Sequence, residues 1–255
     1  MRVRAADGSG IGFDVVGEGE PLVLLAGQAN SKAWWDSVRA EFAGAHRTIA
    51  VDAAGTGDSD DAADGRYGTA RFADDVVAVL DHLGVERAHV YGTSMGGKTA
   101  QRLAIDHPGR LGALVLGCTA PGRRHGLTTP PDVVQLLIGP KRRETLIDLM
   151  YTPSFTGDPM KVLGDAAMSP EATRGHKRAS SQHEAWDGLP GITAPTLVVH
   201  GTDDLLAPVA NARLIADRVP GAKLFLLEGA RHAYFDEFGC QATPAVLDFL
   251  HGHPL

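Results

Sequence analysis

Short runs of apolar residues alternate along this chain with segments whose apolar residues recur every three or four positions. The short runs predict buried strands, and the spaced pattern predicts amphipathic helices. Strands are expected at residues 21–27, 46–52, 86–94, 111–119, 195–201 and 223–229, after an opening hairpin around residues 7–10. Helices are expected over residues 33–42, 69–83, 209–219 and 243–251. Such alternation predicts an α/β fold with a mostly parallel central sheet flanked by helices.

The pattern changes between residues 121 and 190. No strand-like run occurs there, and Gly, Pro and Arg residues interrupt several short helical patterns. We interpret residues 121–190 as a helical lid inserted into one core, which residues 1–120 and 191–255 form together.

The composition excludes several classes of protein. The chain has 255 residues, 44% of them hydrophobic, and a net charge of −7 without a clustered basic helix, which argues against nucleic-acid binding. Cys118 and Cys240 lack the spacing of a zinc or redox site, so no metal is expected. No signal segment and no membrane-spanning stretch is recognised, which favours a cytoplasmic protein with no membrane partner. The sequence leaves the oligomeric state open.

Residues 92–96, Gly-Thr-Ser-Met-Gly, lie between an apolar run and a helical pattern that ends before Pro108. Glycines at both ends of this pentapeptide permit a sharp strand-to-helix turn, which lifts the serine hydroxyl above the end of the strand. Such a pentapeptide can occur by chance, but strand, turn and helix together indicate a nucleophile at Ser94.

A serine hydroxyl is a weak nucleophile until a base accepts its proton. Asp203 and Asp204 follow the strand expected at residues 195–201, and His232 follows the last expected strand. Loops after parallel strands gather at one edge of a sheet, so these groups are expected beside Ser94. The order nucleophile, acid, histidine indicates a serine hydrolase in which His232 is the base and one of the two aspartates orients it.

Over nearly its full length, the chain resembles the serine-hydrolase branch of the α/β-hydrolase fold family, which includes carboxylesterase-like members. In this family the acid ends a Gly-x-x-Asp motif and the histidine ends a Gly-x-x-His motif, which select Asp204 and His232. Residues 94–101 and 117–121 are similar to enol-lactonase-like and cofactor-free haloperoxidase-like members. The resemblance implies hydrolysis of a small-molecule ester, thioester or lactone through an acyl-enzyme, without a cofactor.

Two other functions stay open on the sequence alone. Scaffolds of this fold also serve as ligand receptors or signalling proteins with slow turnover, and such proteins can retain the triad. Hydrogen peroxide, in place of water on the same acyl-enzyme, would give a perhydrolase or haloperoxidase-type side activity.

Acyl transfer also needs hydrogen-bond donors for the charge that develops on the carbonyl oxygen. The backbone N–H of Met95 is one expected donor. The resemblance implies a second donor at Gln28, through either its backbone N–H or its side-chain amide. Ala26 and Ala29 depart from the His-Gly-x-Gly that family members commonly carry there, and Ala54 stands where the family usually has arginine. Loss of that arginine is expected to change the hydrogen bonding beneath the oxyanion loop.

Large apolar side chains are expected to wall the substrate pocket. The candidates are Trp34 and Trp35 after the first parallel strand, and Met150, Tyr151, Phe155 and Trp186 in the lid. Each of them could equally pack in the interior, because large aromatic residues dominate cores as well as binding sites.

Overall fold

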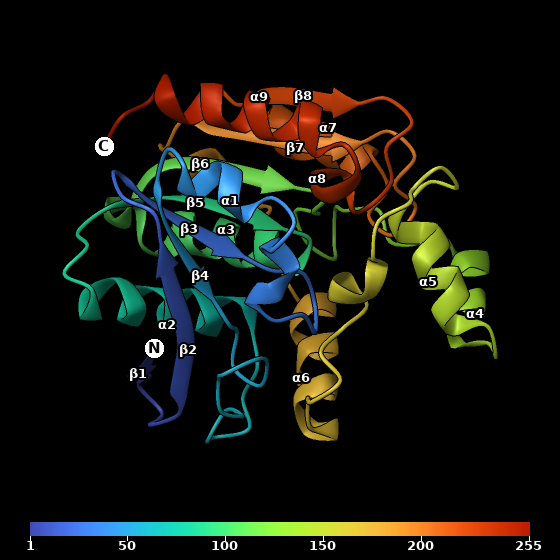
Figure 1. The fold of residues 1–255 in the computed structure, drawn as a ribbon, viewed down its shortest axis with the longest axis horizontal. Coiled ribbons are helices and arrows are strands. Elements are labelled where there is room, and N and C mark those ends of the chain that lie inside the picture. Colours follow the sequence, from blue (N-terminus) through green and yellow to red (C-terminus); the bar gives the residue numbers. More distant parts are fainter.

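The structure is a computed structural model that describes the backbone of residues 1–255 and every side chain except that of residue 160. Its described residues form one eight-stranded sheet in the order β1-β2-β4-β3-β5-β6-β7-β8 (Figure 1). The first two pairings are antiparallel, and all later neighbours are parallel. The strands are β1 (Arg2–Arg4), β2 (Gly10–Val16), β3 (Pro21–Leu25), β4 (Arg47–Val51), β5 (Ala88–Thr93), β6 (Leu111–Gly117), β7 (Thr196–Gly201) and β8 (Lys223–Leu227).

Helices cover both faces of this sheet, as Figure 1 shows for α2 and α9 on opposite sides. On one face, apolar side chains of α2 (Thr69–His82), α3 (Met95–Asp106) and α7 (Ala210–Arg218) are buried against the strands. On the other face, α1 (Arg39–Ala43), α8 (Tyr234–Glu237) and α9 (Gly239–His251) bury theirs. The predicted α/β fold with a mostly parallel sheet is confirmed, and the six parallel strands lie within two residues of their expected bounds.

Two helix predictions were wrong in their bounds. The helix expected over residues 33–42 is a 3-10 turn, η1 (Lys32–Trp35), followed by the short helix α1. Trp34 and Trp35 are both buried and both pack on Phe235 of α8, so contacts with a segment distant in sequence, rather than helical periodicity, set the backbone there. The last helix begins at Gly239 rather than at residue 243 and runs through Pro244. Pro244 lies in the second turn, where its missing N–H removes the hydrogen bond that would reach the Cys240 carbonyl oxygen.

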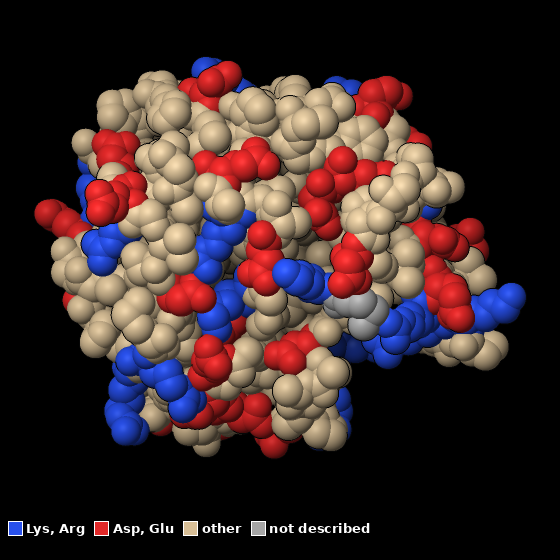
Figure 2. Space-filling model, viewed as in Figure 1, with Lys and Arg blue, Asp and Glu red and all other residues tan. Residues whose placement is uncertain are grey.

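Residues 121–190 combine short helices with turns and loops. They contain α4 (Pro131–Ile138), α5 (Arg142–Met150) and α6 (Pro170–Ser181), with 3-10 turns η3 (Pro159–Val162) and η4 (Leu189–Gly191). In Figure 1, α4 and α5 project from the sheet, and α6 lies nearer to it. Every described helix of the protein is too short or too polar to span a bilayer. On the face drawn in Figure 2, acidic and basic side chains are interspersed.

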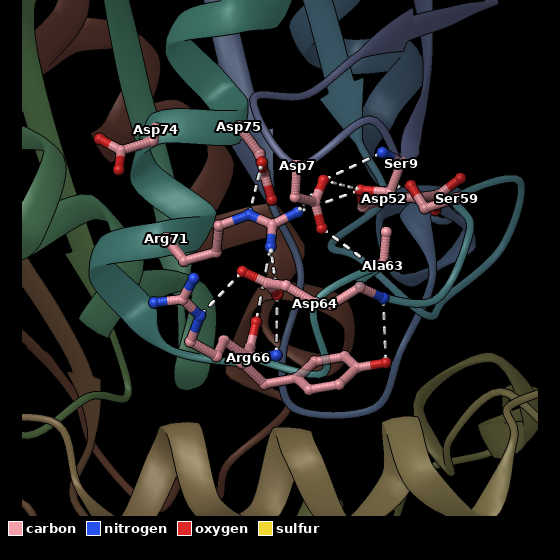
Figure 3. A network of polar contacts seen from close by, with 12 residues as sticks. Asp7, Ser9, Asp52, Ser59, Ala63, Asp64, Arg66, Arg71, Asp74 and Asp75 are labelled. Atoms are coloured by element: carbon pink, nitrogen blue, oxygen red, sulfur yellow. Dashed lines mark hydrogen bonds and ion pairs between the residues drawn. The ribbon is translucent and has the colours of Figure 1, made fainter.

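A partly buried ion-pair network joins the first hairpin to α2 (Figure 3). The Arg71 guanidinium lies 3.0 Å from an oxygen of Asp7 in the hairpin turn and 2.9 Å from Oδ1 of Asp75. Oδ2 of Asp75 is buried and has no hydrogen-bond partner among the described residues. Burial therefore outweighs the charge of Arg71 and raises the pKa of Asp75 to about 6.

Replacing Asp75 with Asn tests this burial. A carboxyl group whose pKa rises on folding binds its proton more tightly in the native state. Its contribution to stability therefore falls as pH rises from its ordinary pKa of 3.8 to its folded pKa of about 6. From pH 4 to pH 7, the free energy of unfolding of Asp75→Asn should gain on that of wild type by up to about 3 kcal/mol. Urea denaturation at the two pH values measures this gain. The same difference between the two proteins at both pH values would contradict the assignment.

Candidate active site

Ser94 occupies a strained turn between β5 and α3. Its backbone angles are φ 54° and ψ −119°, a left-handed conformation that costs a residue with a Cβ about 1–3 kcal/mol. The flanking glycines permit the close packing of this turn. A Cβ on Gly92 would lie 2.3 Å from the Gly96 carbonyl oxygen, and one on Gly96 would lie 2.1 Å from the Leu25 carbonyl oxygen. The sequence pattern around Ser94 is therefore required by the backbone.

Hydrogen bonds from two neighbouring elements hold the Ser94 peptide in place. Its N–H donates to the carbonyl oxygen of Gly117 at the end of β6, at 2.8 Å. Its carbonyl oxygen accepts from the Thr119 hydroxyl at 2.8 Å and from the Lys98 N–H at 3.1 Å. Folding thus offsets the strain of the turn with bonds to β6 and α3.

Asp204 and His232 form a buried pair after β7 and β8. Nδ1 of His232 lies 2.7 Å from Oδ2 of Asp204, and the backbone N–H groups of Leu206 and Ala207 both donate to Oδ1 at 2.9 Å. Burial alone would raise the pKa of Asp204, but the His232 imidazole and the donors around the carboxylate hold it well below its usual range. Asp203, in contrast, is exposed and accepts a hydrogen bond from Thr202.

Cys118 links the Asp204–His232 pair to the turn at Ser94, because it contacts the pair and is the neighbour of a residue bonded to Ser94. Cys118 follows Gly117, the residue whose carbonyl oxygen accepts the Ser94 N–H. Sγ of Cys118, a carboxylate oxygen of Asp204 and a ring nitrogen of His232 all lie within 4.8 Å of one another. Burial raises the pKa of the Cys118 thiol well above its ordinary value. A protonated, buried thiol at this point packs against the pair without competing for its proton.

His200 also contacts the carboxylate, a role that the sequence analysis did not identify. Its imidazole is fully buried on β7, with Nε2 2.7 Å from the Ala207 carbonyl oxygen and 3.3 Å from Oδ2 of Asp204. Because a carbonyl oxygen only accepts, Nε2 carries the ring proton and directs it toward both oxygens. The only sequence signal would have been the spacing of four residues to Asp204.

The loop that carries His232 is bound to the end of α5. The backbone N–H groups of His232 and Ala233 donate to the carbonyl oxygens of Leu149 and Met150, at 3.4 and 2.9 Å. Residues of the 121–190 segment therefore help to fix the backbone that orients the imidazole.

The two expected oxyanion donors lie in different settings. Met95 is the first residue of α3, so its N–H belongs to the first turn, whose donors have no acceptor within the helix. Gln28 is exposed, and its carbonyl oxygen accepts from Nδ2 of Asn30 at 2.9 Å. Among the described residues no acceptor occurs for the Gln28 N–H. This leaves the backbone donor of Gln28 available to a ligand.

The predicted pocket residues divide between the two faces of the sheet. Trp34, Trp35, Met150 and Tyr151 are buried in the apolar cluster beneath α9, with Phe155 packed against it. The Tyr151 and Phe155 rings stack at 3.8 Å, and Nε1 of Trp34 donates to the Thr93 hydroxyl beside Ser94 at 2.9 Å. Trp186 packs instead against the cluster on the opposite face, stacked on His125 at 4.5 Å. The burial of Trp35 and the position of Trp186 favour the packing alternative for both.

A second group of side chains brings metal-ligand atoms together away from Ser94. Atoms of Glu20, His46 and His89 lie within 4.8 Å of one another. However, the Ala113 N–H donates to Nδ1 of His89 at 2.9 Å, so the ring proton lies on Nε2 and faces Glu20 at 3.2 Å. In this tautomer His89 offers no lone pair to a metal ion.

Comparisons with known proteins agree with this fold. Residues 20–238 match the family described as alpha/beta hydrolase fold. RutD of Variovorax paradoxus (strain S110), a proposed carbamate hydrolase, is 31% identical over 91% of this chain and 92% of its own length. The 2-hydroxymuconate semialdehyde hydrolase of Pseudomonas sp. (strain CF600) is 32% identical over 92% of this chain and 88% of its own. The solved structure of Est816, described as an N-acyl homoserine lactone degrading enzyme, is 30% identical with a TM-score of 0.83, and covers 98% of this chain and 100% of Est816.

Substitutions at position 94 measure the strain of the turn without any substrate. Glycine adopts a positive φ freely, whereas alanine keeps the Cβ that causes the strain. The free energy of unfolding of Ser94→Gly should therefore exceed that of Ser94→Ala by about 1 kcal/mol, after the greater flexibility of glycine in the unfolded chain is subtracted. Chemical denaturation of the two variants measures this difference. Equal stability, or a less stable glycine variant, would mean that the turn is unstrained.

Proposed function

Because the chain belongs to the α/β-hydrolase fold family, we propose that it is a serine hydrolase that cleaves a carboxylic ester, thioester or lactone of a small molecule. The observation that carries this proposal is the buried hydrogen bond between His232 and Asp204, beside the strained turn at Ser94. An ionised carboxylate only accepts hydrogen bonds, so the imidazole proton lies on Nδ1. Nε2 then keeps a lone pair for the proton of the Ser94 hydroxyl.

In the first half of the reaction, Ser94 Oγ attacks the substrate carbonyl carbon as His232 takes the hydroxyl proton. The backbone N–H groups of Met95 and Gln28 donate to the oxygen that becomes negative. Asp204 stabilises the imidazolium. His232 then gives its proton to the departing alcohol, thiol or lactone oxygen, and an acyl group remains on Ser94.

In the second half, water replaces the leaving group. His232 Nε2 accepts a proton from the water as its oxygen attacks the acyl carbon, and the same two N–H groups stabilise the new oxyanion. Collapse of this intermediate returns the proton to Ser94 Oγ and releases the carboxylic acid. The free enzyme is restored with no net change in its protonation.

In this proposal, residues 121–190 form the lid, and residues 1–120 and 191–255 form the catalytic core. The hydrogen bonds between the end of α5 and the His232 loop support a lid that belongs to the site. Trp34 is bonded to Thr93 beside Ser94, Met150 is bonded to the His232 loop, and Tyr151 stacks on Phe155, which supports these four residues as one wall of the substrate pocket.

Hydrolysis of p-nitrophenyl esters of increasing acyl length, and of simple lactones, tests the nucleophile. Wild type should turn over many times, and Ser94→Ala should lose at least about a thousandfold in kcat/KM, because the oxyanion donors and the base remain without a nucleophile. Initial rates measured with both proteins give the ratio. Comparable rates in wild type and Ser94→Ala would exclude the mechanism.

The neighbouring aspartates supply a matched pair for the acid. Asp204→Asn removes the negative charge that fixes the histidine tautomer and should lower kcat by about ten thousandfold. Asp203→Asn makes the same chemical change on an exposed side chain and should keep kcat within about twofold of wild type. Steady-state kinetics of the two variants distinguish them. A larger loss in Asp203→Asn would move the acid to that residue.

A further inference from the structure

The oxyanion loop between β3 and η1 is bound to the 121–190 segment by three hydrogen bonds. The Ala29 N–H donates to Nδ1 of His176 at 3.2 Å, and the Ala29 carbonyl oxygen accepts from the Asp165 N–H at 2.7 Å. Oδ1 of Asn30 accepts from the Gly164 N–H at 2.9 Å. Ala29 has a φ of 59°, a conformation that a residue with a Cβ rarely adopts without support. The backbone beside Gln28 is thus held in an unfavourable shape by groups from outside the core.

His176 is the side chain that makes this support. It lies on α6 with a fully buried ring, and its Nε2 is 2.8 Å from the Ala54 carbonyl oxygen. The Ala54 carbonyl oxygen can only accept a hydrogen bond, and the Ala29 N–H can only donate one. The His176 ring is therefore neutral, with its proton on Nε2 and its lone pair on Nδ1. Burial lowers the pKa of His176, against the opposing effects of Ala54 and Asp61, which favours this neutral form.

The position of Ala54 explains why a histidine can reach the loop from α6. The side chain of Ala54 is fully buried and consists of a single methyl group. Helix α6 packs directly on this turn, since a Cβ on Gly55 would lie 2.5 Å from the Ala172 Cβ. The His176 ring lies 5.2 Å from Phe72 and 6.0 Å from Tyr67, measured between ring centroids. An imidazole from α6 therefore occupies the space beneath the oxyanion loop.

We propose that His176 is a positioning residue, which holds the Ala29 peptide through Nδ1 and so directs the Gln28 N–H at the oxyanion. This inference rests on the proposed hydrolase function and assigns part of the oxyanion hole to α6. The histidine touches neither substrate nor reacting atoms. Loss of the hydrogen bond from the Ala29 N–H to His176 should lower kcat far more than it changes KM, because the negative charge on the substrate oxygen develops only in the transition state.

Two amide variants of His176 each keep one of the two hydrogen bonds of the imidazole, either the bond to the Ala29 N–H or the bond to the Ala54 carbonyl oxygen. In His176→Asn, the amide oxygen stands at the position of Nδ1 and can accept from Ala29, but nothing reaches Ala54. In His176→Gln, the amide nitrogen stands at the position of Nε2 and can donate to Ala54, but the acceptor for Ala29 is lost. Both variants lose the aromatic ring, so a purely structural role would affect them alike.

The kcat and KM values of both variants for the best ester found with wild type provide the test, with thermal unfolding measured in parallel. We expect kcat of His176→Gln to fall by about tenfold to a hundredfold with KM within about threefold, and His176→Asn to keep kcat within about threefold. Equal losses in both variants, or wild-type kcat in His176→Gln, would overturn the assignment. If wild type itself hydrolyses no ester, thioester or lactone, the proposed function fails and this inference fails with it. If wild type is active and the variants behave alike, this inference alone fails.

Discussion

The left-handed turn at Ser94 is the constraint on which the rest of the site depends. A serine with φ 54° is stable only if glycines leave room on both sides and hydrogen bonds from β6 and α3 hold its peptide. Those conditions fix β5, β6 and α3 relative to one another. Once they are met, the loops that follow the parallel strands β7 and β8 carry Asp204 and His232 to the same edge of the sheet. The arrangement of the site thus depends on the backbone conformation of Ser94.

Residues 121–190 contribute to the site through its loops. The end of α5 is bonded to the His232 loop, and α6 supports the Ala29 peptide next to the expected oxyanion donor. Loops at the edge of a rigid sheet commonly carry function, and here two of them are also held by helices from residues 121–190. Changes in that segment are therefore expected to alter catalysis as well as substrate access.

Much of this arrangement follows from local patterns in the sequence. The apolar runs predicted the strands, and the spaced motifs selected Ser94, Asp204 and His232 as one group. The contacts of His176 could not be predicted, because its partner Ala29 lies 147 residues away in the chain and no local pattern marks the pair. The helix expected over residues 33–42 was wrong for a similar reason, since the burial of both Trp34 and Trp35 depends on strands and helices distant in sequence.

The central claim is that Ser94 becomes acylated and that water then releases the acyl group. Mass spectrometry of the protein, quenched within milliseconds of mixing with an excess of an activated ester, tests it most directly. The account predicts one acyl group on the peptide that contains Ser94, which disappears as the substrate is exhausted and is absent in Ser94→Ala. Turnover of the ester with the acyl group on a residue other than Ser94, or with no acylated protein while wild type rapidly turns over the activated ester, would contradict it.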